Sequence, residues 1–147
     1  MKLNLAIAGI IGAAAIGVFS WKLLAQDTTS SVWDGVYTEA QAVRGQALYN
    51  SSCASCHGEQ LAGGETAPPL AGGEFMSNWN GLTVGQLFER TRTGMPPGAP
   101  GKVARAAKLD IVAYILSYNK FPAGDKELPQ QTAMMNTIKI EAERPKK

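Results

Sequence analysis

The stretch Cys53-Ala54-Ser55-Cys56-His57 decides how the rest of this 147-residue chain is interpreted. It contains both cysteines and the only histidine of the sequence. The pattern C-x-x-C-H is typical of c-type haem attachment, because two thiols three positions apart can each add to one vinyl group of a flat macrocycle. The adjacent imidazole then lies under the iron, and its second nitrogen can donate to a carbonyl that fixes the ring. The sequence therefore predicts one covalent haem c with His57 as an iron ligand.

Other uses of these three side chains match the sequence less well. A disulfide between Cys53 and Cys56 suits an oxidising compartment and is the main alternative, although it needs no following histidine. A thioredoxin-like redox motif shares the spacing, yet no βαβ pattern surrounds it here. A zinc site usually takes four ligands rich in cysteine or histidine, whereas the chain has three such residues.

The second axial ligand of the iron cannot be another histidine, and methionine is the usual alternative. Met95 lies in the stretch Gly94-Met95-Pro96-Pro97, where the glycine is placed to end a helix and the prolines stiffen the loop. We therefore expect Met95 to be this ligand. Met76 is expected to fill space against haem or core, and Met134-Met135 to pack the tail or lie on the surface.

Helical patterns dominate the middle of the chain, and no run of alternating β-branched residues appears, so the expected fold class is all-α. Thr38 and Gln41 form a capping-box pattern before an expected helix at 39–51. Its core-facing residues are expected to be Ala40, Val43, Ala47 and Leu48.

Glycine and proline pairs interrupt residues 58–82, which are expected to form loops. A second capping-box pattern, Thr83 with Gln86, opens an expected helix that continues to about Thr93. The last expected helix spans 103–119, and its apolar stripe comprises Ala106, Leu109, Val112, Ala113 and Leu116.

The two ends of the chain differ in composition from this middle. Residues 1–26 begin with Met1-Lys2 and continue with a long apolar run, as in a secretion signal. A retained membrane anchor is the main alternative, because seventeen helical residues nearly cross a ~30 Å hydrocarbon core. Residues 27–37 are expected to be a linker, 38–122 the cytochrome c domain, and 123–147 a tail that lies on its own domain or binds a partner. We expect an exported, periplasmic protein; under the anchor alternative it is held at the cytoplasmic membrane.

The distribution of charge along the chain does not point to a nucleic-acid partner. All twelve acidic residues lie beyond residue 26, as do twelve of the fourteen basic ones, so the processed domain is formally neutral. No basic stripe suggests nucleic acid. Electrostatic steering of partners should be local and weak.

Beyond the haem motif, residues 33–122 resemble class I monohaem cytochromes c. The shared features are Gly45 and Tyr49 before the motif, Pro68-Pro69-Leu70 and Met95-Pro96-Pro97 after it, and Tyr114 on the last helix. The resemblance implies that Gly45 lets the first helix cross closely against Tyr114. It also implies that the carbonyl of Pro68 accepts from His57 and that Leu70 packs on the haem face.

A narrower resemblance connects the chain to cytochromes that accompany bacterial quinoprotein dehydrogenases. It rests on the stretches Val32-Trp33-Asp34-Gly35-Val36-Tyr37, Asn78-Trp79 and Phe121-Pro122-Ala123-Gly124-Asp125. In some relatives a tryptophan donates to a haem propionate, and Trp79 has either that role or one in simple packing. Arg90 and Arg92 are expected on a solvated face.

The expected function is electron transfer by a carrier that is not itself an enzyme, with a dehydrogenase or terminal oxidase as partner. The alternative is a cytochrome subunit built into a dehydrogenase or oxidase complex. A gas sensor or peroxidase would need an open iron position. Peroxidase chemistry is disfavoured because no second histidine is available as acid and base.

Overall fold

The computed structural model describes residues 29–146, and the predicted export segment 1–26 lies outside this range. Within the described part of the chain, no helix is both long and apolar enough to cross a membrane. The regular elements in chain order are β1 (Ser30–Ser31), η1 (Val32–Asp34), α1 (Glu39–Ser52), α2 (Ala54–His57), α3 (Gly72–Trp79), α4 (Val84–Gly94), η2 (Pro100–Lys102), α5 (Arg105–Tyr118), α6 (Thr132–Met135) and β2 (Ile138–Lys139). The all-α expectation is confirmed, since the strands comprise two residues each.

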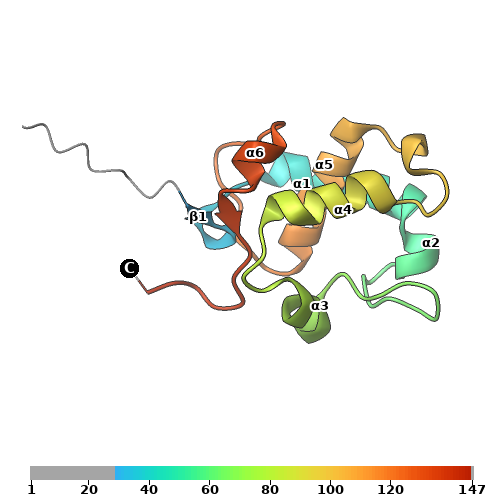
Figure 1. Cartoon of the computed structure of the whole chain (residues 1–147), viewed down its shortest axis with the longest axis horizontal. Coiled ribbons are helices and arrows are strands. Elements are labelled where there is room, and N and C mark those ends of the chain that lie inside the picture. Colours follow the sequence, from blue (N-terminus) through green and yellow to red (C-terminus); the bar gives the residue numbers. More distant parts are fainter. Residues whose placement is uncertain (1–28, 147) are drawn as a thin grey trace, which may run out of the picture.

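The two long helices α1 and α5 pack against each other, and α5 is the more deeply buried of the two (Figure 1). Gly45 lies at their crossing, where a Cβ atom would collide with the Asp110 carbonyl and lie 2.9 Å from Cβ of Tyr114. The close crossing of Gly45 and Tyr114 implied by the family resemblance is therefore present. Tyr49, one helical turn further on, packs its ring against Tyr114 with 5.4 Å between the ring centroids.

The inward face of α1 differs from the predicted one. Ala40, Val43 and Ala47 are exposed, and Leu48 is half-buried. The buried residues are instead Gln41, Ala42, Gly45 and Tyr49. The prediction was wrong because it counted only apolar residues. The close approach of α5 turns the glycine face inward, and the buried side chain of Gln41 accepts a hydrogen bond from the Leu128 N–H.

Helix α5 also differs from its predicted stripe. Ala106 is exposed, whereas the residues from Lys108 to Leu116 are buried except for the half-buried Asp110. A helix surrounded by other elements has no solvent face along its middle, so a one-sided stripe underestimates its burial.

The start and end of α4 are as predicted. Thr83 caps the helix with both halves of the capping box, because its side chain accepts from the Gln86 N–H and the Gln86 side chain accepts from the Thr83 N–H. The helix ends at Gly94, so Met95 is its C-cap. At α1 only the first half of the pattern forms, with Thr38 accepting from the Gln41 N–H at 3.1 Å.

The prediction that residues 58–82 form only loops was wrong, because α3 occupies Gly72–Trp79. Gly72 and Gly73 begin this helix rather than interrupt it. The Gly72 N–H donates to the side chain of Asn119 at 3.1 Å, and Phe75 is fully buried. A glycine pair costs little at the first turn of a helix, where the backbone N–H groups have no intrahelical partner.

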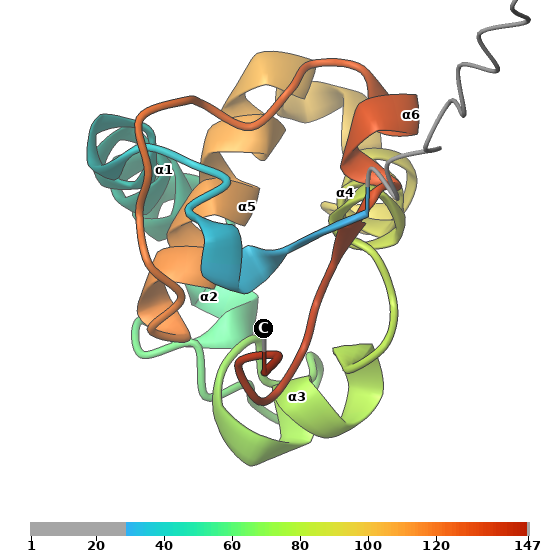
Figure 2. The ribbon, with the colours of Figure 1, turned by 90° about the vertical axis from the view of Figure 1, so that its left-hand side faces the viewer.

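Residues on either side of the helical middle belong to the same hydrophobic core. Val32 and Tyr37 precede α1 and are buried, and the Tyr37 hydroxyl donates to the Phe121 carbonyl at 2.5 Å. The segment after α5 runs over the outside of the helices and returns through α6 (Figure 2). It buries Leu128, Met135, Ile138 and Ile140, and β2 pairs in parallel with β1. We call residues 125–141 the strap.

Candidate haem-binding site

The C-x-x-C-H motif follows α1 directly and is held against it. Cys53 ends α1, and the short helix α2 then carries Cys56 and His57. The hydroxyl of Tyr49 donates to the carbonyl of Gly58 at 2.7 Å, which ties the end of α2 back to α1. Both cysteines are free thiols, and the structure has no disulfide between Cys53 and Cys56. Burial raises the pKa of the Cys53 thiol.

His57 is 7% exposed and held in one orientation by its ring nitrogen Nδ1, which lies 2.8 Å from the carbonyl oxygen of Pro68. A carbonyl can only accept, so Nδ1 carries the hydrogen and Nε2 keeps its lone pair for a metal. The backbone N–H of Gly63 donates to the His57 carbonyl at 2.8 Å. Gly63 has a φ of +76°, and a Cβ atom there would lie 2.6 Å from the Pro69 nitrogen, so this tight loop requires glycine.

A cavity of about 270 Å³ opens beside the motif. Its apolar wall comes from α4, α5 and the loops before α3 and α5: Leu70, Leu87, Val103, Ile111 and Ile115. Cys53, Cys56, His57, Pro68 and Met95 line the same cavity. The structure thus brings together all six residues that the sequence predicted for the site.

Met95 reaches the cavity because α4 ends one residue earlier and the chain turns into an extended conformation, with φ −122° and ψ 138°. Pro96 and Pro97 also line the cavity. Met76 does not contribute to its wall and packs against the hydrophobic core. Of the two methionines in α6, Met135 is buried in the hydrophobic core and Met134 is exposed.

Among the aromatic and basic residues considered from sequence, Trp79 and Arg90 line the cavity. Trp79 packs against Phe75 with 6.2 Å between the ring centroids. Arg90 is exposed at the cavity wall. Arg92 is on the solvated face as expected, where it forms an ion pair with Glu89 at 2.6 Å.

Lys108 is a charged cavity residue that the sequence did not predict for the site. Lys108 lines the cavity although it is 2% exposed, and burial lowers its pKa. Its position three and seven residues before Ile111 and Ile115 places it on the same face of α5 as these apolar residues. This helical spacing, which places a lysine in line with buried apolar residues, is the sequence feature that could have identified Lys108 as a cavity residue.

These residues fit a haem c. Two free thiols and an imidazole with its Nε2 lone pair available lie on one side of an apolar cavity, and a thioether lies on another segment of its wall. Haem iron commonly takes histidine and methionine ligands, and c-type attachment uses two cysteines.

The chain is similar to parts of two known proteins. A curated relative, "Cbb3-type cytochrome c oxidase subunit CcoP" of Azospirillum brasilense, is 28% identical over 82 residues, which cover 52% of this chain and 28% of the relative. The aligned region therefore spans less than a third of that relative's length. A solved structure, the sulfane dehydrogenase SoxCD from Paracoccus pantotrophus, overlaps with a TM-score of 0.47 at 22% identity, covering 85% of this chain and 63% of that one.

The sequence model of one family matches residues 40–115, from the first turn of α1 to the last turn of α5. This range contains the cysteines, His57, Met95 and every residue named above as lining the cavity. It covers more than half of the chain. The chain therefore belongs to the c-type cytochrome family described as cytochrome C oxidase, cbb3-type, subunit III.

Proposed function

We propose that this domain binds one haem c covalently through Cys53 and Cys56, with His57 and Met95 as axial iron ligands, and transfers single electrons between redox proteins outside the cytoplasm. The observation that carries the proposal is the convergence of the motif and Met95 on one apolar cavity. Met95 follows His57 by 38 positions, so their meeting depends on the fold and not on sequence proximity.

The bound haem would supply a one-electron couple between ferrous and ferric iron. Cys53 and Cys56 would hold the haem through two thioether bonds, one to each vinyl group. The Pro68 carbonyl holds His57 in one tautomer. The apolar wall would exclude water from the haem, and Met95 would occupy the ligand position that external molecules could otherwise take. Trp79 and Arg90 are candidates for contact with the propionates.

A second candidate function is that of an electron-transfer subunit in an oxidase or dehydrogenase complex. It is favoured by the relative from Azospirillum brasilense, whose name describes a subunit of a cytochrome c oxidase. Under this proposal the domain receives or delivers electrons only within the complex. Purification from native membranes and from periplasm separates the two: a free carrier is recovered alone, and a subunit copurifies in fixed ratio with its enzyme.

Haem attachment is tested by mass and by haem staining after denaturing electrophoresis. The purified wild-type protein is expected to carry the mass of one haem and to stain. Cys53→Ala with Cys56→Ala should lose both properties and fold poorly, because the macrocycle completes the core. Unchanged staining of the double variant contradicts the proposed attachment.

Ligation by Met95 is tested with a matched pair, Met95→Ala and Met76→Ala. Met95→Ala should lose the weak ligand-to-iron absorption near the red end of the ferric spectrum and bind carbon monoxide when reduced. It should also have a lower reduction potential, because sulfur ligation favours the ferrous state. Met76→Ala should keep the wild-type band and exclude carbon monoxide. The reverse pattern would assign the ligand to Met76.

A further inference from the structure

Lys108 is buried where an ammonium group is costly, since moving a charge out of water requires compensating hydrogen bonds. It is 2% exposed and lies on the α5 face that also carries Ile111 and Ile115. None of the ion pairs found in the described part of the chain involves it. Its position therefore needs an explanation other than an acidic partner.

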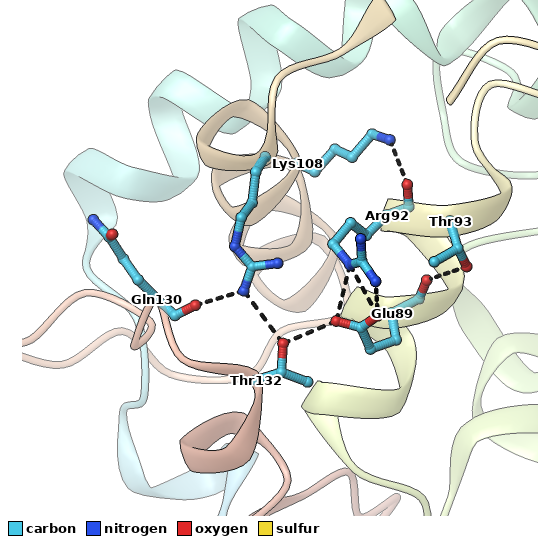
Figure 3. A network of polar contacts seen from close by, with 7 residues as sticks. Glu89, Arg92, Thr93, Lys108, Gln130 and Thr132 are labelled. Atoms are coloured by element: carbon cyan, nitrogen blue, oxygen red, sulfur yellow. Dashed lines mark hydrogen bonds and ion pairs between the residues drawn. The ribbon is translucent and has the colours of Figure 1, made fainter. Parts of the chain in front are cut away.

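The donors of Lys108 reach two backbone carbonyls. Nζ donates to the carbonyl of Arg92 at 2.9 Å and to that of Pro100 at 2.7 Å. Figure 3 shows the first of these bonds, from Lys108 to the end of α4. The Arg92 carbonyl belongs to the last turn of a helix that ends at Gly94, so it has no partner within the helix.

These two acceptors lie on opposite sides of Met95 in the chain. Arg92 precedes Met95 by three residues, and Pro100 follows it by five. One buried side chain on α5 therefore joins the end of α4 to the start of η2 and closes the loop that carries the methionine. Charged donors form stronger hydrogen bonds than neutral ones, and the buried site strengthens them further.

We propose that Lys108 is a positioning residue that holds the Met95 loop closed and places a fixed positive charge beside the haem cavity. This inference rests on the proposed ligation by Met95. A nearby positive charge favours the iron state of lower charge, which is the ferrous one, so Lys108 raises the reduction potential. Holding the loop keeps the thioether in place against thermal opening.

The test uses the holoprotein with Lys108→Met, which has similar length but neither charge nor donors. Lys102→Met is the matched control, because Lys102 is exposed in η2 on the same loop. Carbon monoxide binding to the reduced protein measures opening of the Met95 loop, and redox titration measures the potential. Far-UV circular dichroism in denaturant measures global stability.

Lys108→Met is expected to bind carbon monoxide at least tenfold faster than wild type and to have a lower potential. Lys102→Met should stay within about twofold of the wild-type rate, because exposed charges are screened by solvent. Lys108→Arg keeps the charge and should retain the potential of the wild type. If Lys108→Met does not accumulate, Lys108→Gln replaces it and should change both quantities in the same direction.

Two results would overturn the proposal. One is a Lys108 variant that matches Lys102→Met in both carbon monoxide rate and potential. The other is a variant that loses global stability while its rate and potential stay at wild-type values, because that pattern describes a packing residue only. Failure of the ligand assignment is recognised separately: Met95→Ala would then keep the wild-type band whatever Lys108 does.

Discussion

The buried side chain of Gln41 on α1 accepts a hydrogen bond from the backbone N–H of Leu128 in the strap, with 2.9 Å between Oε1 and N. The two residues are 87 positions apart. Gln41→Leu should lower the free energy of unfolding by about 1–3 kcal/mol, because the Leu128 N–H would be left buried without an acceptor. Denaturant unfolding of the holoprotein measures this loss. Val43→Ala, at an exposed position of the same helix, should change stability by less than about 0.5 kcal/mol.

The crossing of α1 and α5 should not tolerate a side chain at Gly45. Gly45→Ala places a methyl group against the Asp110 carbonyl and Tyr114, so the helices must separate, at a cost of about 1–3 kcal/mol or more. Gly73→Ala is the matched control, since nothing lies within 4 Å of a Cβ atom there. That change in α3 should be neutral or stabilising by up to about 1 kcal/mol. Equal effects of the two changes on the thermal midpoint would contradict the close crossing.

Glu89 connects α4 to the strap and should make stability depend on pH. Its carboxylate pairs with Arg92 and accepts from the Thr132 hydroxyl at 2.8 Å (Figure 3). Two hydrogen bonds lower the pKa of Glu89 below its ordinary value: the one from Arg92 has the larger effect, and the one from Thr132 the smaller. The folded state therefore favours the ionised form of Glu89. Its contribution to the free energy of unfolding is fully present above the ordinary pKa of glutamate, and it is lost as the pH falls through the lower pKa of the folded state.

Accordingly, Glu89→Gln should be less stable than wild type at pH 7 by up to about 1 kcal/mol, as expected for a partly exposed pair. The difference should shrink as the pH falls below about 4, near the ordinary pKa of glutamate. Unfolding of both proteins in denaturant at pH 7 and pH 3.5 measures it. Glu59→Gln removes a carboxylate at an exposed position and is the control for the loss of one negative charge.

Removal of the strap should cost more than any of these substitutions. A chain ending at Gly124 loses Leu128, Met135, Ile138 and Ile140, each buried to at least 95%. Each such side chain contributes roughly 1.5–3 kcal/mol on burial, so the sum approaches the whole stability of a small domain. A chain ending at Glu143 should unfold close to the wild-type midpoint, since it loses only exposed side chains among those described. A folded, haem-loaded protein ending at Gly124 would show that the strap is dispensable.

The sequence was most informative where the chemistry is local. The capping box at Thr83 and Gln86 and the helix end at Gly94 depend on neighbours within four residues, and both are present. The contact of His57 with Pro68 was implied only by family resemblance, because no periodic pattern reports which carbonyl a loop brings to a ring.

What the sequence did not predict depends on contacts between distant segments. The inward face of α1 is the one that α5 approaches closely. Gln41 accepts from Leu128, and the start of α3 donates to Asn119. The two acceptors of Lys108, the carbonyls of Arg92 and Pro100, belong to segments that only the fold brings to its Nζ.

The pairing of β1 with β2 has a practical consequence for handling the protein. Both strands lie at the end of the molecule opposite α2, which carries the haem motif (Figure 1). A linker to an electrode, a bead or a fused enzyme that enters the chain just before Ser30 would therefore leave the Cys56 end facing outward. Immobilisation in that orientation presents the motif end to a soluble redox partner.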